Sequence, residues 1–144
     1  MRPPHVPPAA SASHHRCLAF RSDGRSDAVR PGLTFTRRAL ADWAPDADTA
    51  AVDDVLLVAA ELLANAVDHA GGPLALYLRL EPHSARLRIE VTDRVSAEPR
   101  VRPLLLDEPR GRGVRIIDRI AADWGSRPEE TGKTVWAELH FPAP

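Results

Sequence analysis

The stretch "ELLANAVDHA", residues 61–70, decides the fold and raises the question of function. Leu, Ala and Val make up most of this segment, yet Glu61, Asn65 and His69 occur at successive fourth positions. Residues four apart lie on the same side of an α-helix, one turn above another. The segment therefore predicts an amphipathic helix that carries a narrow stripe of polar side chains.

This helix is predicted to begin at a cap on Asp48 or Thr49 and to end at about His69 or Ala70, before the pair Gly71–Gly72. At about 100° per residue, one sector is apolar and is expected to pack on a sheet. The members of this sector are Leu56, Ala60, Leu63, Val67 and Ala70. The polar positions expected on the opposite side are Asp54, Glu61, Asn65, Asp68 and His69.

The polar stripe has two interpretations. It can be the solvated back of an amphipathic helix, although such positions usually carry Lys, Arg or Gln and only His69 is basic here. Val58 and Leu62 flank the stripe, which predicts a polar floor between apolar walls, as in a ligand pocket. In phosphate chemistry, Asn65 can hold Mg²⁺ through its amide oxygen, and Glu61 can accept a proton from an attacking hydroxyl or water.

The composition indicates one soluble domain without affinity for nucleic acid or membranes. Of the 144 residues 44% are hydrophobic, and 19 Lys and Arg residues nearly balance 20 Asp and Glu residues. No apolar run approaches the roughly 20 residues of a membrane-spanning helix, and the lone Cys17 excludes an internal disulfide. We therefore expect a cytoplasmic protein with no direct nucleic-acid partner and no membrane partner.

The rest of the chain predicts helices that alternate with strands. Residues 1–15 are rich in Pro, Ala, Ser and His and are expected to form a disordered tail before a domain spanning residues 16–144. The predicted strands are residues 16–20, 73–82, 85–93 and 134–141. The predicted helices are residues 27–43, whose start Pro31 is expected to delay, 49–70 and 111–125, which Gly125 ends. These elements predict an α/β fold, a two-layer sandwich with helices on one face of a mixed, mainly antiparallel sheet.

Two further motifs are consistent with a nucleotide site. "RGRGV", residues 110–114, precedes a predicted helix, where unpaired N–H groups favour a phosphate, although Gly-x-Gly is equally typical of a turn. "VTD", residues 91–93, ends a strand on Asp93. That carboxylate is either a turn former or an acceptor for an exocyclic amine such as that of adenine. Lys133 is expected to be a turn residue.

The order of these motifs resembles the GHKL or Bergerat ATP-binding fold, which DNA gyrase, Hsp90, histidine kinases and MutL share. The similar stretches are "ELLANAVDHA", "VTD", "GRGVRIIDRIAADWG" and "GKTVWAEL", within residues 16–141. Within this family the chain is most similar to small actinobacterial regulators related to anti-sigma factor serine/threonine kinases. The resemblance implies a histidine kinase-like ATPase domain with ATP and Mg²⁺ as cofactors.

The resemblance also implies roles for individual residues. Asn65 would bind Mg²⁺, and Glu61 would be the general base. Asp93 would read adenine, and Thr134 would support the adenine through Asp93 or a water. The residues implied at the phosphates are His69, Gly111, Arg112, Gly113 and Val114. The chain departs from the family after the strand, where "DRVSAEP", residues 93–99, replaces Asp-x-Gly-x-Gly and supplies no glycine for close backbone approach to the nucleotide.

By the same resemblance, the protein is expected to be an anti-sigma-type kinase. It would transfer phosphate from ATP to a Ser or Thr of a STAS-type anti-anti-sigma partner, and exchange that partner for a sigma factor. A nucleotide-gated binding module without turnover is the alternative that the missing glycines favour. The catalytic domain of a two-component histidine kinase is a third interpretation, but it needs a phosphoacceptor helix pair for which the short tail leaves no room. Homodimerisation is expected from the relatives.

Overall fold

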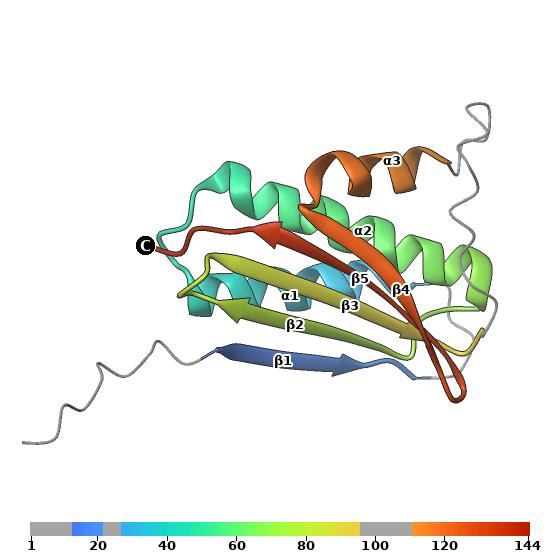
Figure 1. Ribbon diagram of the computed structural model, residues 1–144. Helices are drawn as coiled ribbons and strands as arrows, with labels where there is room; N and C mark the ends of the chain where they lie inside the picture. The colour runs from blue at the N-terminus through green and yellow to red at the C-terminus, as the bar shows by residue number, and fades with distance from the viewer. Residues whose placement is uncertain (1–12, 22–26, 96–110) are drawn as a thin grey trace, which may run out of the picture.

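Three helices cover one face of a five-stranded sheet in the computed structural model, which describes residues 13–21, 27–95 and 111–144 (Figure 1). The helices are α1 (Val29–Trp43), α2 (Thr49–Ala70) and α3 (Gly111–Ile120). The strands are β1 (His14–Ala19), β2 (Ala75–Glu81), β3 (Arg86–Asp93), β4 (Asp123–Glu129) and β5 (Gly132–His140). They follow the order β1-β2-β3-β5-β4, and every neighbouring pair is antiparallel. The predicted two-layer α/β sandwich is confirmed, with an antiparallel rather than a mixed sheet over the described residues.

The hydrophobic core lies between the helices and the sheet. Its largest buried side chains come from every layer; they are Leu40, Leu62, Leu63, Leu76, Leu78, Leu80, Leu87, Ile89, Ile117 and Phe141. Alternate residues of β2 and β3 are buried, as expected of strands that a helical layer covers on one face only. Within the described ranges, no helix is both long and apolar enough to cross a bilayer.

Both ends of α2 form as predicted. The Asp48 carboxylate accepts a hydrogen bond from the Ala50 N–H at 3.4 Å and caps the first turn. At the other end, Gly71 adopts a φ of 70°, in the left-handed region that favours glycine, and its N–H donates to the carbonyl of Ala66. These signals are local, so the sequence alone predicts them correctly.

The buried face of α2 differs from the predicted one. Its buried residues are Val55, Val58, Ala59, Leu62, Leu63 and Ala66. Of the predicted apolar sector only Leu63 is among them, and Val58 and Leu62, predicted as pocket walls, belong to the core at 0% and 1% exposure. The helix packs against α1, α3 and the sheet. Because apolar residues occupy most of the circumference of α2 outside its polar stripe, the period alone could not select the direction of the core.

Helix α1 approaches α2 closely at a glycine. It begins at Val29, so Pro31 does not delay its start as expected, because a proline in the first turn removes no intrahelical hydrogen bond. Gly32 is buried, and a Cβ atom at this position would overlap Leu63 Cδ1 of α2. The absent side chain therefore allows the close approach of the two helices.

Replacing Gly32 by alanine is expected to lower the free energy of unfolding, because the added methyl group overpacks the α1–α2 contact at a cost of about 1–3 kcal/mol. The overlap should outweigh the better helix propensity of alanine, which is worth about 1 kcal/mol. Urea denaturation followed by circular dichroism measures the change, with Thr34→Ala, at an exposed position of α1, as the control. A Gly32→Ala variant as stable as the wild type would show that Leu63 moves aside without loss.

Strand β4 is an element that the sequence pattern does not predict. Helix α3 ends at Ile120 rather than at Gly125, and Asp123–Glu129 pairs with β5. This edge strand has mostly exposed side chains and contains Pro128, so it shows no apolar alternation and is defined by its pairing. A Cβ atom at Gly125 would lie 3.1 Å from Trp136 Cζ2. The glycine therefore makes room for the indole ring and does not end a helix.

Strand β1 begins inside the segment predicted to be disordered. His14 pairs with Leu80 of β2, and its ring stacks on Trp43 with the centroids 5.5 Å apart. The Ser13 hydroxyl donates to Glu81 at 2.7 Å. These tertiary contacts order residues that have little apolar surface of their own. Residues 1–12 of the predicted tail and residues 96–110 of the Pro-rich stretch lie outside the described residues.

Candidate functional site

Glu61 and Asn65 lie on the side of α2 that faces away from α1. Leu63 packs beside α1, and both polar residues lie about 160° around the helix from it at 100° per residue. Helix α2 runs between α1 and α3 and contacts both (Figure 1), so these residues are turned toward α3. Both side chains are half-buried. The other members of the predicted stripe are exposed; they are Asp54, Asp68 and His69.

The environment of Glu61 perturbs its proton equilibrium. Burial raises the pKa of the Glu61 carboxyl above its ordinary value, because removal from water disfavours the charged form. A carboxyl group whose pKa is raised toward neutrality is better matched to accepting a proton at physiological pH. The position of Glu61 one turn before Asn65 is thus chemically suited to a general base.

Replacing Glu61 by glutamine is expected to raise the melting temperature at pH 7 and to change it little at pH 4. The raised pKa means that the folded protein holds this proton more tightly than the unfolded chain does. Stability therefore falls as the pH rises from the unfolded pKa of about 4.3 through the higher folded pKa. Glutamine has no charge and avoids this loss. Thermal unfolding of both proteins at the two pH values is the test, and a less stable variant at pH 7 would contradict it.

Asp93 ends β3 on the face of the sheet that the helices cover, as its alternation with Val91 and Ile89 requires. It is only 3% exposed. Its Oδ1 accepts a hydrogen bond from the Val95 N–H at 2.9 Å, and its Oδ2 lies 3.2 Å from Lys133 Nζ. The first contact is the turn-forming role that the sequence left open, and the second is an ion pair that the sequence did not indicate.

Lys133 is a buried strand residue and not the predicted turn residue. It lies in β5 opposite Asp93 and is 6% exposed. Its ammonium group also donates to the carbonyl oxygen of Val95 at 3.4 Å. The only sequence signal for this position is its place in the alternation of β5, which puts it on the same face as Val135 and Ala137.

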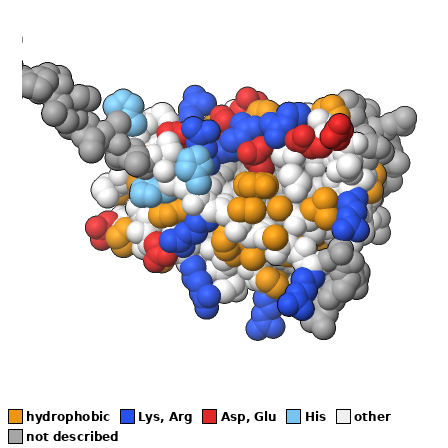
Figure 2. Space-filling model, turned by 90° about the horizontal axis from the view of Figure 1, so that it is seen from below, with side chains coloured by type: hydrophobic (Ala, Val, Ile, Leu, Met, Phe, Trp, Pro, Cys, Tyr) orange, Lys and Arg blue, Asp and Glu red, His pale blue; other side chains and the backbone are white. Residues whose placement is uncertain are grey.

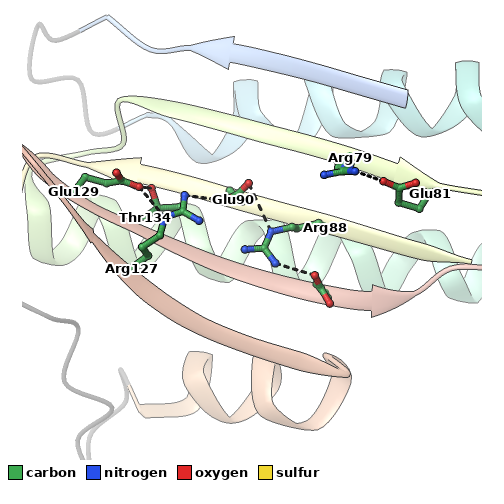
Figure 3. A network of polar contacts seen from close by, with 8 residues as sticks. Arg79, Glu81, Arg88, Glu90, Arg127, Glu129 and Thr134 are labelled. Atoms are coloured by element: carbon green, nitrogen blue, oxygen red, sulfur yellow. Dashed lines mark hydrogen bonds and ion pairs between the residues drawn. The ribbon is translucent and has the colours of Figure 1, made fainter. Parts of the chain in front are cut away.

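Thr134 points to the open face of the sheet, which is the face that the helices do not cover. Its hydroxyl donates to Glu129 Oε1 at 3.0 Å, within a network that joins Glu129 to Arg127 and Arg127 to Glu90 (Figure 3). Hydrogen bonds from Arg127 and Thr134 lower the pKa of Glu129. Because successive strand residues face opposite sides, the structure brings Lys133, and not the Thr134 hydroxyl, to Asp93. The structure therefore shows no direct contact between Thr134 and Asp93, and support of the adenine by Thr134 through a water stays a prediction.

The glycines predicted at the phosphates form the start of α3. Residues 111–114 make up its first turn, in agreement with the predicted start of this helix at residue 111. The first N–H groups of a helix lack intrahelical acceptors and favour an anion. The side-chain surroundings of Gly111, Arg112, Gly113 and Val114 lie outside what the structure describes. His69, the other predicted phosphate residue, is exposed in the last turn of α2.

A groove of about 470 Å³ lies elsewhere, between β1 and α1. Its lining is apolar at Leu18, Pro31 and Phe35 and charged at its margins; the remaining lining residues are Arg16, Asp27, Arg30, Thr34 and Arg38. Figure 2 shows hydrophobic side chains in the middle of one face with Lys and Arg side chains around them. No residue of the predicted nucleotide site lines this groove, so it is a separate feature of the surface.

The side chain of Asn65 offers one oxygen that would suit a Mg²⁺ ion whose other ligands come from a bound phosphate and water. Over the described residues, no group of three or more His, Cys, Asp or Glu side chains could hold a metal ion on its own. Mg²⁺ in phosphate-binding sites typically takes one or two protein oxygens and completes its shell with phosphate oxygens and water. The half-buried Asn65 amide oxygen suits that kind of site.

Comparisons with known proteins agree with the architecture. A family model described as a histidine kinase-like ATPase domain matches residues 27–139. The structure of the RsbU and RsbW domains of Rv1364c from Mycobacterium tuberculosis is similar over 92% of this chain, with a TM-score of 0.64 and 17% identity; the match covers 33% of that chain. The histidine kinase domain of the blue-light activated histidine kinase from Erythrobacter litoralis EL346 is similar over 62% of this chain and 44% of that chain, with a TM-score of 0.45 and 23% identity. No curated protein matches the chain.

Proposed function

Because the chain belongs to the histidine kinase-like ATPase domain family, we propose that it binds ATP with Mg²⁺ on residues of α2, α3 and the end of β3. One observation carries the proposal. Glu61 and Asn65 are half-buried one turn apart on the α3 side of α2, whereas Asp54, Asp68 and His69 of the same stripe are exposed. Partial burial of two polar groups without a role in the core favours a ligand that uses them.

Each group has a distinct task in this proposal. The Asp93 carboxylate accepts a hydrogen bond from the adenine amine, and the Asn65 amide oxygen holds Mg²⁺ against the phosphates. The N–H groups at the start of α3 bind phosphate oxygens, and the exposed His69 imidazole adds a further donor. Mg²⁺ neutralises phosphate charge when bound. Glu61 accepts the proton of the attacking hydroxyl.

The proposed activity is that of a serine/threonine kinase that acts on a STAS-type anti-anti-sigma protein and releases it in exchange for a sigma factor. The likeness in fold to a structure that contains an RsbW domain supports this class of regulator. Phosphoryl transfer asks the protein mainly for positioning and charge neutralisation, and Glu61, Asn65 and α3 are suited to both.

A nucleotide-gated binding module without turnover is the second candidate. The sequence "DRVSAEP", residues 93–99, favours it, because it has none of the glycines with which relatives bring their backbone close to the nucleotide. In this alternative, ATP binding changes the affinity for a partner protein and is not followed by phosphate transfer.

Calorimetric titration of the purified protein with ATP, with and without Mg²⁺, tests the proposal. We expect Mg²⁺-dependent binding in the micromolar range. Incubation with labelled ATP and a STAS-domain protein then separates the two candidates, since the kinase transfers the γ-phosphate and the module does not. Absence of ATP binding would reject the nucleotide site itself.

A further inference from the structure

We propose that Lys133 is a positioning residue for recognition of the adenine base, acting through Asp93. Its ammonium group neutralises the charge of the buried carboxylate and fixes its plane, so that a free lone pair is directed to the exocyclic amine of the nucleotide. This inference rests on the proposed function, because it presupposes that Asp93 binds adenine. It adds a determinant of base selectivity that neither the family motif nor the sequence pattern indicated.

Two contacts hold the Asp93 carboxylate in place, and a third holds Lys133. Val95 N–H donates to Oδ1 at 2.9 Å, and Lys133 Nζ lies 3.2 Å from Oδ2. Lys133 Nζ in turn donates to the Val95 carbonyl oxygen at 3.4 Å. The contacts close a ring through the two side chains and the backbone of Val95. Both carboxylate oxygens are thereby engaged, and the carboxylate cannot rotate without breaking one of these contacts.

Burial distinguishes this ion pair from the others. The side chains of Lys133 and Asp93 are 7% and 2% exposed, whereas those in the other ion pairs of the described residues are at least 22% exposed. Several of those other pairs lie on the open face of the sheet (Figure 3). Lys133 is also the only lysine of the chain, which otherwise uses arginine.

A buried ion pair is a poor device for stability alone. Desolvation of the two charges offsets most of their attraction, and a well-packed apolar pair of similar volume is often as stable or more stable. An adenine site, by contrast, needs a carboxylate here. An ionised carboxylate has about four lone-pair positions, so it can accept from Val95, Lys133 and a ligand amine at the same time. The ion pair therefore provides a buried acceptor that is already oriented.

The selectivity between ATP and inosine triphosphate tests this role, because inosine carries a carbonyl group in place of the exocyclic amine. We expect Lys133→Met to lower the affinity for ATP, and the ratio of ATP to inosine triphosphate affinity, by about tenfold or more, as for the loss of a hydrogen bond to a charged group. Lys133→Arg retains the cation and should restore most of the ratio. Arg86→Met is the matched control. Arg86 lies on the same strand as Asp93, and this substitution removes its exposed ion pair with Glu138; it should leave the ratio unchanged.

The outcomes separate this role from the proposed function. If the Lys133→Met variant binds ATP with the affinity of the wild type and with the same ratio of ATP to inosine triphosphate affinity, the role of Lys133 is overturned and the nucleotide site stays intact. Tighter ATP binding by Lys133→Met would also overturn it, because Lys133 would then compete with adenine for Asp93. Absence of ATP binding by the wild type would reject the nucleotide site and the role of Lys133 with it.

A double variant covers the case in which Lys133→Met does not fold because it leaves a buried carboxylate unpaired. Asp93→Asn combined with Lys133→Met removes both charges and should recover a cooperative urea transition. We expect this protein to bind ATP no better than inosine triphosphate, because the amide at position 93 can also donate to the inosine carbonyl. Preference for ATP in the double variant would refute the assignment of selectivity to the ion pair.

Discussion

Replacement of Asn65 by alanine is expected to abolish Mg²⁺-dependent binding of ATP and to leave the fold intact. Asn65 is half-buried on the side of α2 that faces α3, outside the buried face of the helix. Alanine is the better helix former, so the helix itself gains. The lost amide oxygen is the ligand that the proposed site is expected to offer to Mg²⁺. The affinity for Mg²⁺-ATP should fall beyond the roughly 10–100-fold that loss of an outer-shell partner causes.

Calorimetric titration with Mg²⁺-ATP and with ATP alone measures this effect, and circular dichroism checks the fold. Asp68→Ala is the matched control, since Asp68 lies on the same helix three residues later and is exposed. It should bind Mg²⁺-ATP as the wild type does. Unchanged affinity in Asn65→Ala would remove Asn65 from the site, and with it the observation on which the proposed function depends.

Replacement of Glu61 by alanine should spare ATP binding and reduce phosphate transfer by a factor of about 10² to 10⁴, the usual contribution of general acid–base catalysis. Because burial raises the pKa of Glu61, the wild-type rate should fall as the pH is lowered through this raised value, where the base becomes protonated. Rates of γ-phosphate transfer from labelled ATP, measured between pH 5 and 8, test both statements. Transfer at the wild-type rate in Glu61→Ala would exclude Glu61 as the base.

The local signals of the sequence determined several elements by themselves. The cap at Asp48 and the left-handed Gly71 bound α2 at the predicted residues, and alternation predicted the antiparallel pair of β2 and β3. These features depend on interactions within a few residues or on a simple period, so the tertiary context has little influence on them. The sequence indicates Glu61 and Asn65 for the same reason, because the recurrence of a polar residue at every fourth position of this segment depends only on a simple period.

The tertiary structure decided the features that depend on contacts between distant segments. The direction of the core on α2 follows from its neighbours α1 and α3, because the apolar sector of its sequence is wider than the face that is buried. Strand β4 exists through its pairing with β5 and has no alternation of its own. The partner of Asp93 is Lys133 and not Thr134, because the register of β3 with β5 determines which residue of "GKTV" shares the face of Asp93.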